Sequence, residues 1–283
     1  MKLFSNNVRF CLYAILFAAI CLSGSVVFGQ DKNKDKNWEF CSKNNTWNNG
    51  ASYSELREQT IPNTNLLDVD SGRNGGIKVV GSDRSDILIR ACIQTWADTD
   101  NEAKAIANNI KLETNPKVEA KSNDSTHSNW GVSYEIFVPR SINLKLLTFN
   151  GGISIKSVEG NLDFEAHNGG ISLNEVGGNV KGRTKNGGVS VKLAGNSWKG
   201  SGLDVETTNG GVNLSMPENY AAQIEAGTVN GGFRSDINGL NVEKNDSRRW
   251  YRSSKINTSI NGGGAPIRVV TTNGGVNINA SNK

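Results

Sequence analysis

The sequence predicts an all-β fold, namely a right-handed single-stranded β-solenoid (β-helix-like) with an N-terminal cap that contains one short helix. The first observation is a repeat, because Asn-Gly-Gly followed by a large apolar residue recurs along the chain. The copies at Asn150, Asn168 and Asn186 are each 18 residues apart (168−150 and 186−168). A fixed period of this length is typical of stacked repeats. The predicted corner residues are Asn150, Gly151, Gly152, Asn168, Gly169, Gly170, Asn186, Gly187, Gly188, Asn209, Gly210, Gly211, Asn230, Gly231, Gly232, Asn273, Gly274 and Gly275.

The second observation is an alternation of apolar and polar residues on both sides of each corner. In the first regular copy Ile153, Ser154 and Ile155 follow the glycines, and the other copies keep this order with few exceptions. Period two indicates a strand with one buried face. Asn and Gly both tolerate positive φ, so we expect the corner to use that conformation. Gly160 and Gly178 mark a second corner, which gives about two strands per repeat.

The third observation is charge, and it bears on an alternative fold. Asn-Gly between alternating strands is also the strongest short signal for a hairpin, so an antiparallel meander is the competing interpretation. Opposite charges alternate at equal offsets from the corner, however, and such positions are neighbours only in parallel coils. One series is Lys145, Asp163, Lys181 and Asp204, and the other is Glu165, Arg183 and Glu206. The parallel solenoid is therefore favoured, and its right hand follows from the usual handedness of parallel crossovers.

The N-terminus has the features of an export signal. Residues 1–29 combine the charges of Lys2 and Arg9 with an apolar run over 12–22 and small residues before a cleavage point at Gly29. A retained N-terminal anchor is the alternative. The formal net charge of +4 falls to about +2 without this segment, and no basic block remains. The composition therefore gives no reason to expect nucleic acid as a partner.

The rest of the chain is predicted to form a leader with a capping segment (30–66) and the solenoid itself (67–283). We expect residues 38–53 to be irregular, a first coil at 67–79, a strand at 87–96 and a helix at 103–110 after the capping box 99–102. Strands near Val118 and 132–138 complete a cap over the open end of the coils. Regular coils span about 145–236, and an inserted loop spans about 238–260.

Two cysteines, Cys41 and Cys92, remain after removal of the signal. In an oxidising compartment the simplest outcome is one disulfide between them, and two buried free thiols are the alternative.

Several of these segments resemble the bacterial putative-adhesin family of exported β-strand-repeat proteins, a domain of unknown function. The similar pieces are 137–139 leading through 144–146 into Asn150, the coils with Gly160-Asn161 and Gly178-Asn179, and 216–220 before Ile224. The resemblance extends from about Leu67 to the C-terminus. It implies an extracytoplasmic solenoid and supplies no catalytic residues.

The best catalytic candidates are Asp163, Glu165 and His167, three polar residues on one face of one strand. Carboxylates beside a histidine can perform acid–base chemistry on a glycan. Lys181 and Arg183 follow at equal offsets, however, so a solvated charge ladder is the stronger interpretation. His127 has no evident partner. We expect no metal and no cofactor, because Cys/His zinc spacing, calcium-roll aspartates and a phosphate loop are all missing from the sequence.

A candidate ligand-contact loop contains Arg248, Arg249, Trp250, Tyr251 and Arg252, which could stack on sugars or meet an acidic surface. The alternative is a loop folded onto the solenoid flank. The sequence thus favours a non-enzymatic protein of the periplasm, cell surface or medium, used as an adhesin or cell-envelope scaffold. Its expected partner is a cell-surface glycan or an envelope protein, with no membrane span after signal cleavage. The alternatives are a polysaccharide-active enzyme on a β-helix and an envelope stress or sensory domain.

Overall fold

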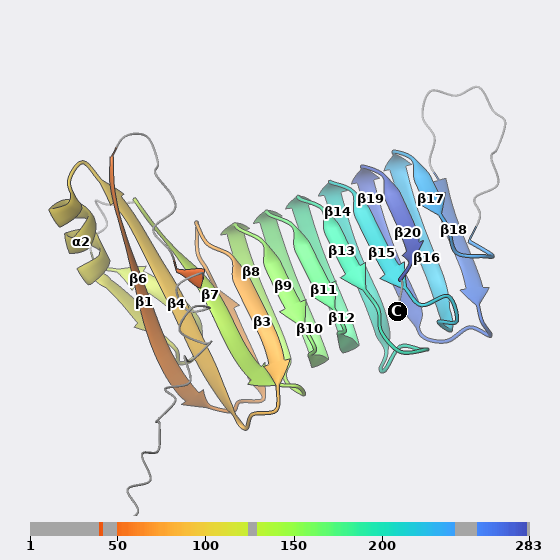
Figure 1. Ribbon diagram of the computed structural model, residues 1–283, viewed down its shortest axis with the longest axis horizontal. Helices are drawn as coiled ribbons and strands as arrows, with labels where there is room; N and C mark the ends of the chain where they lie inside the picture. Colours follow the sequence, from red (N-terminus) through yellow and green to blue (C-terminus); the bar gives the residue numbers. More distant parts are fainter. Residues whose placement is uncertain (1–39, 42–49, 124–128, 241–253, 282–283) are drawn as a thin grey trace, which may run out of the picture.

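The computed structural model describes residues 40–41, 50–123, 129–240 and 254–281, and it is built almost entirely from β-strands (Figure 1). The strands form two sheets of ten strands each. Within the described part of the chain, one α-helix, α2 (Asp100–Asn108), lies at one end of the elongated molecule (Figure 1). The predicted export signal lies outside the described residues.

Each sheet takes strands from the whole length of the chain. The order in sheet A is β1 (Ala51–Pro62), β4 (Asp86–Ala97), β7 (Trp130–Pro139), β3 (Ile77–Ser82), β9 (Ile153–Lys156), β11 (Ile171–Asn174), β13 (Val189–Lys192), β15 (Val212–Met216), β20 (Val276–Ala280) and β17 (Phe233–Ser235). The order in sheet B is β18 (Ser254–Ile260), β16 (Ala222–Asn230), β19 (Pro266–Asn273), β14 (Gly202–Asn209), β12 (Gly177–Asn186), β10 (Glu159–Asn168), β8 (Asn143–Asn150), β2 (Leu66–Asp70), β6 (Val118–Ser122) and β5 (Ile110–Glu113).

The coils stack in parallel and in register, as the charge pattern predicts. Asp163 on β10 pairs with Lys145 on β8 and with Lys181 on β12. In sheet A, Ile171 pairs with Ile153 and Val189. Equal offsets from the corner are therefore neighbours in space, which excludes the antiparallel meander for these coils. The inward residues form one continuous core between the sheets.

Two ladders of side-chain hydrogen bonds connect one coil to the next. In the first, the amide of each corner asparagine donates to the amide oxygen of its neighbour at 2.7–3.0 Å, along Asn74, Asn150, Asn168, Asn186, Asn209, Asn273 and Asn230. In the second, a buried threonine hydroxyl donates to the carbonyl of a corner glycine in the adjacent coil, for example Thr207 to Gly187 at 2.7 Å. The other donors are Thr148, Thr184, Thr228 and Thr271. The threonine bonds satisfy hydroxyl groups that the corner would otherwise bury without a partner, whereas most of the asparagines are exposed.

The reason for glycine at these corners differs from the predicted one. Of the predicted corner glycines, only Gly274 has a positive φ (158°), so the expectation of positive φ is wrong for the others. The first glycine of each pair is instead required by close approach between coils. A Cβ on Gly187 would lie 2.2 Å from the carbonyl oxygen of Gly169, whereas one on Gly188 would lie 3.4 Å from that of Gly211. Positive φ occurs at the opposite corner, at Ser157 and Glu175 (55° each).

The coils do not stack in sequence order at the C-terminal end. Asn209 is followed in space by Asn273, and only then by Asn230, because β19 pairs with β14 on one side and β16 on the other. The coil formed by β19 and β20 thus lies between two coils that precede it in the sequence. This corrects the expected run of regular coils over 145–236. The expected loop at 238–260 is also partly wrong, since 254–260 form β18, which pairs antiparallel with β16.

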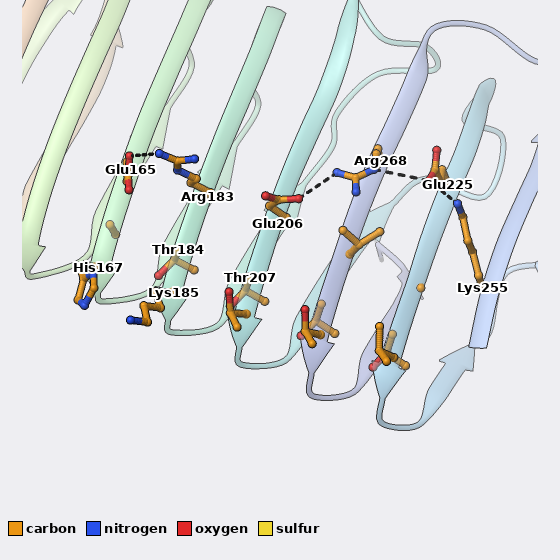
Figure 2. A pocket seen from close by; sticks show the side chains of 18 residues that line it. Glu165, His167, Arg183, Thr184, Lys185, Glu206, Thr207, Glu225, Lys255 and Arg268 are labelled. Carbon is orange, nitrogen blue, oxygen red and sulfur yellow. Dashed lines mark hydrogen bonds and ion pairs between the residues drawn. The ribbon is translucent and has the colours of Figure 1, made fainter. Parts of the chain in front are cut away.

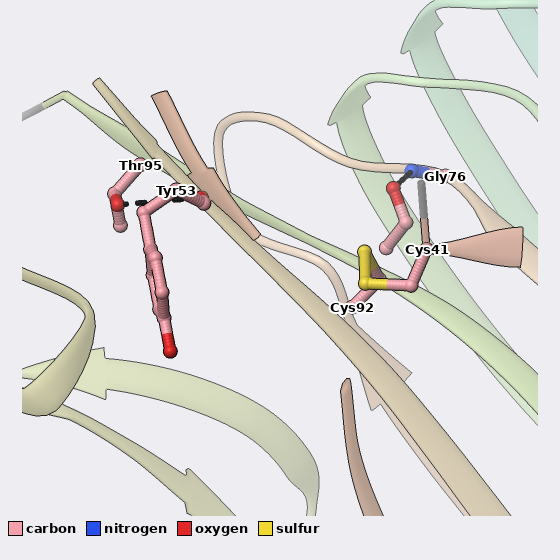
Figure 3. Close-up of a disulfide and its surroundings, with 6 residues drawn as sticks. Cys41, Tyr53, Gly76, Cys92 and Thr95 are labelled. Carbon is pink, nitrogen blue, oxygen red and sulfur yellow. Dashed lines mark hydrogen bonds between the residues drawn. A yellow bond between two sulfur atoms is a disulfide. The ribbon is translucent and has the colours of Figure 1, made fainter. Parts of the chain in front are cut away.

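The N-terminal cap combines a long antiparallel unit with the helix. β1 pairs with β4 over 12 residue pairs, and β4 pairs with β7, so residues 51–53 are not irregular as expected. Thr99 and Glu102 form the predicted capping box, although the helix begins three residues earlier than predicted. Cys41 and Cys92 form the predicted disulfide, with their Cα atoms 5.4 Å apart (Figure 3).

A buried ion pair lies beside the disulfide on the same strand. Arg90 is 4% exposed and binds the carboxylates of Glu135 and Glu58, while the ring of Phe40 lies 5.4 Å from its guanidinium carbon. The disulfide therefore fixes residues 40–41 over the charged centre of the cap.

Candidate ligand-binding groove

The outer face of sheet B carries rows of charged side chains that run across the strands. Along the first row acidic and basic residues alternate without interruption from β2 to β16, in the order Asp68, Lys145, Asp163, Lys181, Asp204, Arg268 and Glu225. The second row contains Glu165, Arg183 and Glu206, then Val270, Gly227 and finally Lys255. Neighbouring rungs of a row are one strand spacing apart, about 4.8 Å.

A groove of about 510 Å³ lies on this face, over β10, β12, β14, β19, β16 and β18 (Figure 2). It forms because the second row has only Val270 and Gly227 between Glu206 and Lys255, which leaves a gap among the long side chains. Thr208, Thr272 and Val229 lie along one side, in a third row that also contains His167 and Lys185. The side chains on the floor of the groove are therefore short and partly apolar, and those on its rim are charged.

The charges around the groove are held in defined positions by ion pairs. Arg183 binds Glu165 at 2.7 Å, Lys255 binds Glu225 at 2.8 Å, and Arg268 contacts Asp204 at 2.5 Å and Glu206 at 3.4 Å. The hydrogen bond from Lys255 lowers the pKa of Glu225, and the hydrogen bond to Glu165 raises the pKa of Arg183. Among the described residues Lys185 has neither an ion pair nor a side-chain hydrogen bond. Counted over its described lining residues, the groove thus offers one free cation, Lys185, and three carboxylates that are already paired.

The predicted catalytic candidates are brought to this face, but as members of the rows. Glu165 pairs with Arg183, and Asp163 lies between Lys145 and Lys181. His167 stacks on the ring of Phe149, with centroids 4.5 Å apart and an angle of 7° between the planes. Within the described ranges, no group of three or more His, Cys, Asp or Glu side chains could hold a metal ion.

Two other predicted features fall outside the described residues, namely His127 and the loop Arg248–Arg252. Sequence reasoning, in turn, missed the stack of Phe149 on His167. The signal is present in the sequence, since both residues immediately precede a corner asparagine and therefore occupy the same outward row. The groove over Val270 and Gly227 was also missed, because it depends on β19 lying next to β14 and β16.

Comparisons with known proteins give a family and distant structural similarities. A family model described as Toastrack DUF4097 matches residues 48–279. The comparison with curated proteins gives no match. No helix among residues 40–41, 50–123, 129–240 and 254–281 has the length and apolarity needed to cross a membrane.

Three solved structures are similar to this chain and share little sequence identity with it. A putative cell adhesion protein from Clostridium sporogenes is 15% identical, with 80% of this chain and 100% of that chain covered and a TM-score of 0.44. A putative adhesin from Bacteroides fragilis is 12% identical, with 81% and 97% covered and a TM-score of 0.29. A putative lipid binding protein from Parabacteroides distasonis is 12% identical, with the same coverage and a TM-score of 0.26.

Proposed function

Because the chain belongs to the Toastrack DUF4097 family, we propose that it is a non-enzymatic, extracytoplasmic binding module whose ligand lies in the groove on sheet B. An adhesin or a cell-envelope scaffold is the role that this proposal favours. We also propose that the solenoid is right-handed and single-stranded, and that residues 1–29 are cleaved as an export signal. The disulfide between Cys41 and Cys92 supports an oxidising compartment outside the cytoplasm.

The observation that carries the proposal is the groove with its rim of fixed, paired charges. A ligand that meets such a rim encounters donors and acceptors already in position, so little side-chain entropy is lost on binding. Alternating charges along a rigid sheet also favour ligands with a matching repeat and disfavour others. Lys185 is the group most available for a new partner, because it is exposed and unpaired among the described residues.

The enzymatic alternative finds less support on this face. General acid–base catalysis needs a carboxyl group poised to exchange a proton near neutral pH. Glu165 and Glu206 each contact an arginine, and the pKa of Glu225 is lowered by Lys255, which favours the ionised form. Paired carboxylates of this kind are suited to holding a structure or a ligand in place.

A pair of lysine substitutions tests the proposal. Lys185 lies in the groove and Lys192 lies on the outer face of sheet A, and both are exposed with no side-chain partner among the described residues. Purified wild-type protein, Lys185→Glu and Lys192→Glu are incubated with isolated cell envelopes of the native host, and the bound fraction is measured at increasing protein concentration. We expect Lys185→Glu to lower the apparent affinity about tenfold, and Lys192→Glu to leave it unchanged.

An equal effect of both substitutions would place binding elsewhere and contradict the proposal. Release of soluble reducing sugars from the envelopes by the wild-type protein, above a heat-inactivated control, would favour the polysaccharide-active alternative.

A further inference from the structure

The ladder of corner asparagines is held from both sides at every corner except its last. At each of the other corners the following coil in space supplies two bonds, one to the backbone and one to the side chain. At Asn186-Gly187 the Gly187 N–H donates to the Asn209 carbonyl at 2.9 Å, and the Oδ1 of Asn186 accepts from the Nδ2 of Asn209 at 2.8 Å. The same two bonds occur at the corners that begin with Asn74, Asn150, Asn168, Asn209 and Asn273.

Asn230 occupies the last corner, and no coil follows it. Its side-chain amide donates back to Asn273 at 2.7 Å. Among the described residues, however, no group donates to its Oδ1 and no carbonyl accepts from the Gly231 N–H. β18 does not replace the missing coil, because its antiparallel pairing with β16 ends at Thr228. Gly231 is accordingly exposed, whereas the first glycine of every other corner in the ladder is partly buried.

The sequence Asn-Gly has a chemical reactivity of its own. Asparagine is thermolabile, and it deamidates most readily before glycine, because glycine has no side chain to hinder attack by its backbone nitrogen. That nitrogen loses its proton and attacks Cγ of the asparagine, so that an N–Cγ bond forms, the Cγ–Nδ2 bond breaks and ammonia leaves. Water then opens the resulting succinimide at either carbonyl, which gives aspartate or isoaspartate. Water is the only co-reactant, and nothing is oxidised or reduced.

Both bonds of an interior corner oppose this reaction. The bond from the glycine N–H holds the attacking nitrogen against the next coil, and the bond to Oδ1 fixes the asparagine side chain in the ladder. The nitrogen can therefore reach Cγ only after the corner has opened, and local opening of a bonded segment costs free energy. At Asn230-Gly231 neither bond is present among the described residues, so no such opening has to come first.

From this difference we propose that Asn230 is a site of spontaneous deamidation, and that the stacking of the coils protects the other corners of the ladder. Aspartate at this position places a carboxylate against the Oδ1 of Asn273, where the amide now donates. Isoaspartate also lengthens the backbone between β16 and β17 by the Cβ atom. Thr228 and Val229 line the groove just before Asn230, so the new negative charge lies beside it. The reaction needs no ligand and is independent of the proposed function.

The test follows each corner by peptide mapping of the full chain during incubation at mildly alkaline pH. One sample is folded and the other is unfolded in urea. Urea removes the structural protection but leaves each Asn-Gly sequence unchanged, so the ratio of the two rates isolates the effect of the fold. The product is recognised by its higher mass and its added negative charge. Cleavage at Glu225 and Arg234 separates Asn230 from Asn209 and from Asn238, which also precedes a glycine.

We expect Asn230 to deamidate in the folded protein at a rate close to its rate in urea. Folding should slow the interior corners, such as Asn168 and Asn186, about tenfold or more relative to Asn230. Asn230→Gln is the matched control, because glutamine retains a side-chain amide but closes the corresponding larger ring far more slowly. This variant should lose the product at residue 230 and leave the rates of the interior corners unchanged.

A smaller difference between Asn230 and the interior corners would overturn the proposal, because the last corner would then be protected without a following coil. Product that persists in the same peptide of Asn230→Gln would also overturn it, since another residue would then be the site of the reaction.

Discussion

The stacked coils and the N-terminal cap are both made of strands, but different interactions hold them together. Between coils the same bonds recur, from asparagine to asparagine at each step and from threonine to glycine in every coil except that of Ala166. In the cap each interaction occurs once, as in the disulfide, the buried Arg90–Glu135 pair and the capping box of α2. Repeated bonds can join any coil to any other, whereas single interactions specify one partner. The cap therefore fixes where the stack begins, whereas the bonds between coils do not depend on the order of the coils in the sequence.

The largest effect is expected from removing the disulfide, which should loosen the cap and leave the coils intact. The double variant Cys41→Ser/Cys92→Ser releases a connection between residues 51 apart in the sequence, which should lower the free energy of unfolding of the cap by about 4 kcal/mol. Hydrogen exchange measures this region by region, and amides of β1 and β4 should exchange faster.

Amides of β12 serve as the internal control in that experiment and should be unaffected. Equal acceleration in β12 and β4 would mean that the cap and the coils unfold as one unit, which would contradict the expected difference between them.

The next largest effect is a difference in stability between alanine substitutions at two adjacent glycines of one corner. Gly187→Ala forces a Cβ to within 2.2 Å of the Gly169 carbonyl oxygen, so the coils must move apart at a cost of about 3 kcal/mol. Gly188→Ala meets its nearest neighbour at 3.4 Å and should change the free energy of unfolding by less than about 1 kcal/mol in either direction. Urea denaturation of the two variants measures the difference.

Similar losses for the two substitutions would show that backbone freedom, and not contact between coils, selects glycine here.

A smaller effect tests the order of the coils. Asn209 and Asn273 share a hydrogen bond of 2.8 Å, while Asn230 bonds to Asn273 and not to Asn209. In double-mutant cycles with alanine, the pair Asn209/Asn273 should show a coupling of about 0.5–1 kcal/mol in the free energy of unfolding. The pair Asn209/Asn230 should be additive to within about 0.3 kcal/mol.

A coupling between Asn209 and Asn230 that exceeds the coupling between Asn209 and Asn273 would indicate that the coils stack in sequence order, and would contradict the position of β19 next to β14.

The smallest effect concerns the exposed charge rows, where solvent screens each pair. Arg183→Glu places three glutamates on adjacent strands and should cost a few tenths to about 1 kcal/mol of unfolding free energy per like-charge pair. Glu165→Arg in the same molecule should recover part of the loss, because Glu165 and Arg183 bind at 2.7 Å. Melting curves of the three variants at low and high salt measure both effects, and high salt should reduce them.

Additive, salt-insensitive shifts would show that the rows contribute nothing beyond their individual side chains.

Much of the coil architecture could be predicted because it is periodic. The family resemblance is confirmed by the family model, and the parallel register is confirmed by the pairing of Asp163 with Lys145 and Lys181. The order of the last coils could not be predicted, because Asn230 and Asn273 each begin a copy of the same Asn-Gly-Gly motif and either copy could follow that of Asn209. The physical reason for the corner glycines could not be predicted either, because a glycine can be required by a positive φ or by close approach of another chain segment, and the sequence does not distinguish the two.

The cap and the site were predicted less completely for a different reason. β1 alternates weakly, with residues such as Glu55, Arg57 and Gln59 in place of a clear apolar series, so its pairing with β4 has little local signal. The charge rows were predicted from equal offsets. The groove is defined by the short side chains of Val270 and Gly227, and such a gap becomes visible only when the neighbouring strands are known.

The position of β19 and β20 between earlier coils has a consequence for how the chain folds during synthesis. In the described structure β16 pairs only with β18 and β19, and β17 pairs only with β20. As the chain is synthesised from its N-terminus, coils can therefore be added one after another as far as β15. β16, β17 and β18 can join the stack only after residues 266–280 have formed β19 and β20, because these two strands lie between them and β14 and β15. Premature termination before residue 266 would accordingly leave three strands, β16, β17 and β18, out of the stack and one edge of β14 and of β15 unpaired, although only the last coil had been lost.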